Sequence, residues 1–113
     1  MHSINRTAIL ILARQPFLDW LHQTDPSFPI TLVQLNEDAN IYLIPESDNP
    51  EHPQKWLRRH FDTIFSGELE SWYPEESLWP AHRTFTLFEK WFSWTAHSLV
   101  YDLAKDSLRY DDF

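Results

Sequence analysis

The chain has 113 residues, no cysteine, and 17 acidic against 9 basic residues, which gives a formal net charge of -8. This length suits one domain, residues 1–113, whose core is large enough to be stable without cross-links. The missing cysteines exclude disulfides, zinc–thiolate sites and thiol nucleophiles. The negative charge makes nucleic acid an unlikely partner and opposes binding to anionic membranes. Because the missing cysteines fit a reducing compartment, we expect a cytoplasmic protein.

The first two predicted elements are a strand and a helix. The run "TAILILA" (7–13) is rich in Ile and Leu, which is typical of a central strand buried on both faces, and it is too short to span a membrane. Phe17, Trp20 and Leu21 then follow Pro16 at helical spacing. We therefore predict a helix from Pro16 to about Thr24, followed by a proline-rich loop.

Residues 31–44 predict a hairpin, with arms at 31–35 and 40–44 and a polar turn between them. The first arm has an alternative. Leu32 and Leu35 also have helical spacing and the turn lacks glycine, so a short helix through "TLVQLNED" fits the same residues.

The longest pattern is a helix predicted over 54–73, whose apolar residues recur at steps of three and four. Gly67, the only glycine, lies inside this pattern, and the unbroken period predicts that the helix continues through it. A shorter helix begins at Thr84 or Thr86, and alternation predicts a strand over 92–103. The charged segment 104–113 is predicted to be a mobile tail unless Leu108, Tyr110 or Phe113 packs back.

This order of elements predicts an α+β fold of the ferredoxin-like split β-α-β type, a sandwich with all helices on one face of one sheet. If residues 31–35 are helical, a three-stranded α+β sandwich remains, with the same one-sided layering. Both versions leave the other face of the sheet open.

The aromatic segment "LWPAHRTFTLFEKWFSW" (78–94) is predicted to lie mostly in the core, because Phe and Trp each bury a large area. The open face nevertheless holds apolar residues that the helices do not cover. Such a patch usually marks a partner, often a second copy of the chain. The residues expected there are Leu10, Leu12, Tyr42, Ile44, Leu99 and Tyr101.

Candidate ligand-binding residues are few. Arg83 lies beside Trp79 and before a predicted helix, where it can hold an anion, although a structural arginine stacked on Trp79 fits as well. His97 shares a predicted strand face with Tyr101, and Tyr42 and Tyr101 offer rings to a single-stranded nucleic acid, which the net charge opposes. No spacing typical of a metal site is present, and the single glycine excludes nucleotide-binding loops, so no cofactor is expected.

Four segments resemble a group of small, uncharacterised bacterial proteins: "RTAILILARQPFLDWL", "IYLIPE", "LWPAHRTFTLFEKWF" and "HSLVYDL". The resemblance covers about half the chain and contains no catalytic signature. It implies a bacterial, single-domain, cytoplasmic protein and transfers no functional residue.

The sequence therefore favours a protein-interaction or self-associating module that uses the open sheet face. The alternative is a small-molecule binder or minor enzyme with a pocket near Trp79, Arg83 and His97. Whether the chain catalyses any reaction stays open, with a binding role preferred.

Overall fold

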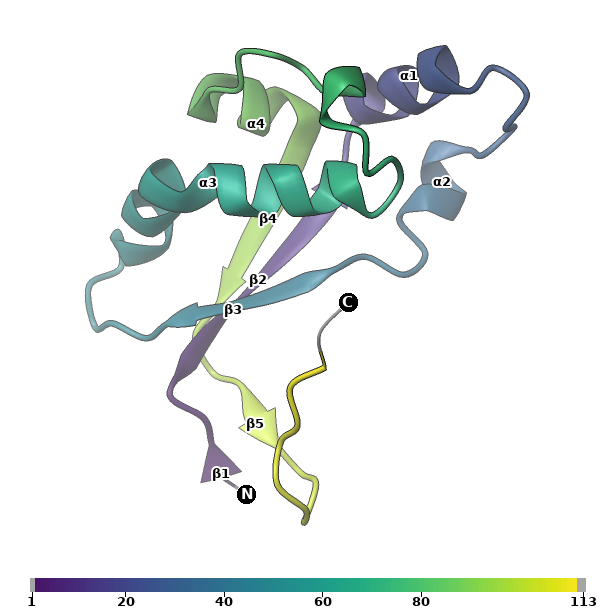
Figure 1. Cartoon of the computed structure of the whole chain (residues 1–113). Coiled ribbons are helices and arrows are strands. Elements are labelled where there is room, and N and C mark those ends of the chain that lie inside the picture. The colour runs from purple at the N-terminus through teal and green to yellow at the C-terminus, as the bar shows by residue number, and fades with distance from the viewer. Residues whose placement is uncertain (1, 112–113) are drawn as a thin grey trace.

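The structure is a computed structural model that describes residues 2–111 (Figure 1). Its elements alternate between short strands and helices, as expected for an α+β fold. In chain order they are β1 (His2–Ser3), β2 (Arg6–Ala13), α1 (Gln15–Thr24), α2 (Leu32–Leu35), β3 (Ile41–Pro45), α3 (His52–Glu70), the 3-10 turn η1 (Glu76–Leu78), α4 (Phe85–Trp91), β4 (Phe92–His97) and β5 (Tyr101–Asp102).

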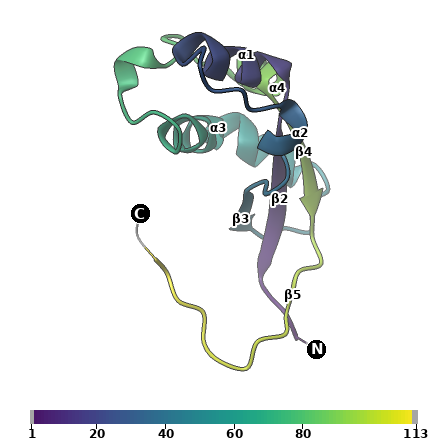
Figure 2. The same cartoon turned by 90° about the vertical axis from the view of Figure 1, so that its right-hand side faces the viewer.

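Strand β2 is the centre of an antiparallel three-stranded sheet with the order β3-β2-β4. Ile9 lies opposite Tyr42 on one side and opposite Ala96 on the other, so these three side chains share a face. Strands β1 and β5 form a second, two-stranded antiparallel sheet beyond the end of β2. Figure 2 shows α1, α3 and α4 on one side of the three-stranded sheet. β2 is central, as predicted, but helices cover only one of its faces.

The predicted hairpin is wrong in its first arm, because residues 32–35 form the short helix α2 that was the alternative. A capping box explains this choice: the Thr31 hydroxyl accepts the backbone N–H of Gln34, and the Gln34 side chain accepts the N–H of Thr31. The sheet therefore has three strands, and a complete four-stranded ferredoxin-like sheet is not formed.

The other helices agree with the sequence. α3 runs through Gly67, where an added Cβ would lie 3.9 Å from the Tyr42 hydroxyl, an ordinary contact. α4 begins after Thr84, whose hydroxyl accepts the N–H of Leu87. The strand predicted over 92–103 is right only as far as His97, since Tyr101 belongs to the separate two-stranded sheet.

The core lies between the three-stranded sheet and its helices, and aromatic rings fill much of it. Phe65, Phe88 and Phe92 are fully buried, and their rings meet one another with centroids 5.4 to 6.0 Å apart. The aromatic segment 78–94 is therefore largely interior, as predicted, because Phe85, Phe88 and Phe92 are buried and Trp79, Trp91 and Trp94 pack against the same core.

Residues 104–111 lie outside helices and strands, and Leu108 and Tyr110 are exposed. The expectation for Phe113 falls outside the described residues. In the part of the chain that the structure describes, no helix has both the length and the apolar character needed to cross a membrane.

Candidate functional site

The face of the three-stranded sheet that points away from the helices is apolar along its middle. Ile41 and Leu43 on β3 are 63% and 49% exposed, and Leu10 and Leu12 on β2 are half-buried beside them. We call this surface the outer face. Its strand residues are Arg6, Ala8, Leu10, Leu12, Ile41, Leu43, Pro45, Ser93, Thr95 and His97.

The predicted membership of this face was wrong for β3. Tyr42 and Ile44 lie opposite Ile9 and Thr7, so they point to the helices, and Ile41 and Leu43 point outward. Successive strand residues alternate between faces, so an error of one residue in phase reverses every assignment. Leu10 and Leu12 are on the outer face as predicted, whereas Leu99 follows the end of β4 and Tyr101 lies beyond this sheet, opposite Ser3.

The outer face differs in charge from the rest of this acidic protein. Arg6 and His97 are ionisable, and none of its strand residues is Asp or Glu. The His97 ring bonds the Thr95 hydroxyl at 3.0 Å on the same face. A chain with a net charge of -8 thus presents an apolar surface whose ionisable side chains are basic.

Exposed apolar side chains also gather in residues 99–111, which we call the C-terminal arm. The arm contains β5 and the segment after it, and Figure 2 shows that segment leaving on the helix side of the sheet. The arm therefore leaves the outer face of its own sheet uncovered. Its exposed large apolar side chains are Leu99, Tyr101, Leu103, Leu108 and Tyr110.

The structure brings Trp79 and Arg83 together but leaves His97 elsewhere. The Arg83 guanidinium lies 5.6 Å from the Trp79 ring centroid, and its Nε donates to Asp62 at 2.7 Å. That hydrogen bond is the main cause that raises the pKa of Arg83. Glu70 lines the same shallow recess, and His97 does not. The guanidinium is already engaged by protein groups, which favours the structural interpretation of Arg83.

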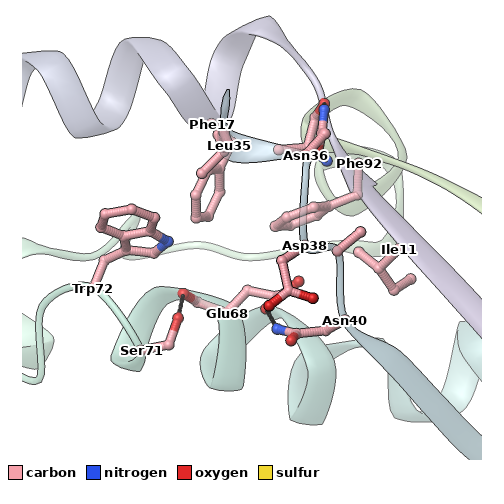
Figure 3. A pocket seen from close by; sticks show the side chains of 12 residues that line it. Ile11, Phe17, Leu35, Asn36, Asp38, Asn40, Glu68, Ser71, Trp72 and Phe92 are labelled. Atoms are coloured by element: carbon pink, nitrogen blue, oxygen red, sulfur yellow. Dashed lines mark hydrogen bonds between the residues drawn. The ribbon is translucent and has the colours of Figure 1, made fainter. Parts of the chain in front are cut away.

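A cavity of about 290 Å³ lies between the loop 36–40 and the C-terminal end of α3 (Figure 3). We call it the Glu68 pocket. Aromatic rings of Phe17, Trp72 and Phe92 form part of its wall, and Asp38 from the loop and Glu68 from α3 also line it. The pocket draws on segments far apart in the sequence.

Glu68 is buried among groups that bond its carboxyl. Asn40 donates to Glu68 Oε2 at 2.6 Å, and Tyr42 lies nearby on β3. Burial raises the pKa of Glu68 above its ordinary 4.5, although the hydrogen bond from Asn40 opposes the rise. Burial, followed by the Glu68 charge, raises the pKa of Tyr42, which therefore stays neutral.

This pocket was not predicted from the sequence, although one signal for it was present. Glu68 stands four residues after Ile64 and three after Phe65, on the apolar stripe of α3 where a charged residue is out of place. The hairpin prediction places Asn36 and Asp38 in its turn and Asn40 at the start of its second arm. Nothing in the sequence placed that loop beside α3.

Within residues 2–111, no group of three or more His, Asp or Glu side chains is arranged to hold a metal ion. Comparisons of the chain with protein-family models, curated proteins and solved structures gave no match.

Proposed function

We propose that this chain is a self-associating module, in which the C-terminal arm of each copy lies across the outer face of a second copy. The observation that carries the proposal is the concentration of exposed apolar side chains. Of ten large hydrophobic residues that are exposed among residues 2–111, Ile41 and Leu43 belong to the outer face and five more to the arm. Apolar patches of this kind usually mark an interface.

The size of the outer face favours contact with an arm over contact between two bare sheets. Strands lie about 4.8 Å apart and rise about 3.3 Å per residue, so three strands of five residues cover only about 240 Å². Two such faces together bury much less than the roughly 1,000 Å² that a stable interface needs. The five apolar side chains of the arm supply the additional contact area.

Charge supports the same arrangement. The arm carries three aspartates against two basic residues, whereas Arg6 and His97 are the ionisable groups among the strand residues of the outer face. An acidic, apolar segment is therefore a complementary occupant, while two outer faces packed together would bring like charges close. We expect salt to weaken the association.

Two finer assignments belong to this proposal. The strand order β3-β2-β4 is the order of a split β-α-β sandwich that lacks one edge strand, which leaves the far edge of β3 free for an arriving segment. The cytoplasm remains the expected compartment for the cysteine-free chain.

Light scattering coupled to size-exclusion chromatography tests the association. The unmodified chain is expected to show a dimer whose population falls on dilution, and Leu43→Asp to remain a monomer. Val33→Asp is the matched control, because Val33 is exposed on α2 and is not an outer-face residue. A strict monomer at about 100 μM, well above a micromolar Kd, overturns the proposal. So does a Leu43→Asp dimer as stable as that of Val33→Asp.

Cross-linking tests which surfaces meet, on a natural background without cysteine. A Leu43→Cys chain mixed with a Leu108→Cys chain is expected to form a mixed disulfide under mild oxidation. A disulfide between two Leu43→Cys chains, without the mixed product, would mean that two outer faces meet and would overturn the arm assignment.

A further inference from the structure

The Glu68 pocket has the walls of a small-molecule site and an unusual charge balance. Its volume of about 290 Å³ is at the lower end of the range for ligand pockets. Two carboxylates, Glu68 and Asp38, line it, and none of its lining residues is Lys, Arg or His. The rest of its wall combines the polar side chains of Asn36, Asn40 and Ser71 with aromatic and aliphatic side chains. A ligand would therefore meet negative charge, neutral polar groups and apolar surface in one small space.

Glu68 is nine-tenths buried, which makes it more than a surface carboxylate. Its carboxyl is held in place by the hydrogen bond from Asn40 of the loop, so it does not need to be ordered when a ligand arrives. A fixed carboxylate that is largely removed from water binds a cationic group more strongly than one in bulk water.

A hydrogen-bond donor faces the same space. The Trp72 side chain is half-buried, and Figure 3 shows its indole nitrogen on the side of the ring that is nearer the cavity. The indole N–H groups of Trp20 and Trp79 donate to backbone oxygens of Leu78 and Tyr73. Within residues 2–111, no protein acceptor is bonded to the Trp72 N–H, so a ligand oxygen can take that place.

We propose that the Glu68 pocket binds a small organic ammonium ion that also carries a hydroxyl or carbonyl oxygen, with the ammonium group on Glu68 and Asp38. The oxygen accepts the Trp72 N–H, and the short aliphatic part of the ligand lies against Phe17 and Phe92. The net charge of -8 favours the approach of a cation. The proposal is independent of self-association, because none of its residues belongs to the outer face or the arm.

The probe is 5-amino-1-pentanol, added to the full chain while the Trp72 indole N–H signal is followed by NMR. A saturable shift of that signal is expected at about 10 mM probe or below, the range of weak fragment binding. The neutral analogue 1,5-pentanediol has the same shape without the charge and is expected to bind at least about tenfold more weakly. No shift with the amine, or equal binding of amine and diol, overturns the proposal.

Variants locate the charge that matters. Glu68→Gln and Asp38→Asn keep the shape of each side chain and are each expected to weaken amine binding about tenfold or more. Glu70→Gln is the matched control, because Glu70 is exposed on the same helix and outside the pocket. Its affinity for the amine is expected to equal that of the unmodified chain. If Glu68→Gln and Asp38→Asn both bind like Glu70→Gln, the shift arises elsewhere and the assignment is wrong.

Discussion

The two faces of the three-stranded sheet are built from similar residues and have opposite environments. On the face toward the helices, Ile9, Ile11 and Ile44 are at most 2% exposed. On the outer face, Ile41 and Leu43 are largely open to solvent although they occupy the same strand as Ile44. Aliphatic side chains thus line both faces, and the helices of one copy cover only one.

This difference between the two faces supports the outer face as the proposed interface. Strands that read as continuous apolar runs are usually covered on both sides, whereas strands with one wet face alternate apolar and polar residues. The sequence of β2 is a continuous apolar run, but in a single copy of the chain one face of this strand is not covered by helices. A second layer supplied by another copy would remove this mismatch, which is why the outer face, and not a surface of the helices, is the proposed interface.

The largest expected effect comes from neighbouring residues on β3 that point to opposite faces. Ile44→Ala leaves a cavity among packed helices and is expected to lower the free energy of unfolding by about 2 to 4 kcal/mol. Leu43→Ala, measured at low protein concentration, is expected to cost less than about 1 kcal/mol because its side chain is already half exposed. Urea unfolding of both variants measures the difference. Equal losses would contradict a one-sided core.

The next largest effect is expected at the end of β2, where a side chain bonds backbone groups that a neighbouring strand would otherwise bond. Asn36 Oδ1 accepts the N–H of Ala13 and Asn36 Nδ2 donates to the C=O of Ala13, at 2.8 and 2.9 Å. Asn36→Ala is expected to lower the free energy of unfolding by about 1 to 3 kcal/mol, because two backbone groups lose their partners. Asn36→Asp keeps the acceptor, so urea unfolding should place it between Asn36→Ala and the unmodified chain.

The sequence predicted the elements whose signal is local. Helices α1, α3 and α4 and strand β2 have apolar periods and caps that can be read within one segment. The four-residue helix α2 could not be separated from a strand because Leu32 and Leu35 fit both periods. The phase of β3 and the end of β4 at His97 depend on pairing with β2, which the sequence does not show.

The candidate sites show the same limit. An apolar outer face was predicted correctly, but four of its six expected residues were wrong. Tyr42 and Ile44 failed because the face of each residue follows from the register, and Leu99 and Tyr101 failed because β4 ends at His97. The Glu68 pocket needs residues from the loop 36–40, α1 and α3 to meet, and only tertiary packing brings them together. The pairing of Trp79 with Arg83 was predicted because the two residues are close in the sequence. The position of His97 depends on the face of β4 that it occupies, which the sequence does not show.

A smaller effect concerns the covered side of the sheet, where Glu68 is buried. Its raised pKa means that the native state binds a proton more tightly than the unfolded state does. The stability that this proton contributes is complete below about pH 4.5 and is lost as the pH rises through the native pKa. Glu68→Gln stays neutral, so its stability relative to the unmodified chain is expected to increase with pH over that interval.

Urea unfolding at several values between about pH 4 and pH 8 measures this change. Glu70→Gln, at an exposed position of the same helix, is the reference for removing one negative charge. If the stability of Glu68→Gln relative to the unmodified chain fell as the pH rose, the sign would be wrong for a carboxyl whose pKa is raised by burial.

The smallest effect lies on the solvent side of the helices, where contacts with water limit what an ion pair contributes. Arg83→Lys loses the two-pronged contact with Asp62 and the stacking on Trp79, and is expected to cost less than about 1 kcal/mol. The wholly surface pair of Lys55 and Glu51, 3.2 Å apart, is a weaker control, and Lys55→Ala should change stability by less than about 0.5 kcal/mol. Urea unfolding of both variants beside Ile44→Ala ranks the three environments. If Arg83→Lys cost as much as Ile44→Ala, its charge contacts would matter as much as the core, and the contrast between the two sheet faces would no longer account for where this fold gains its stability.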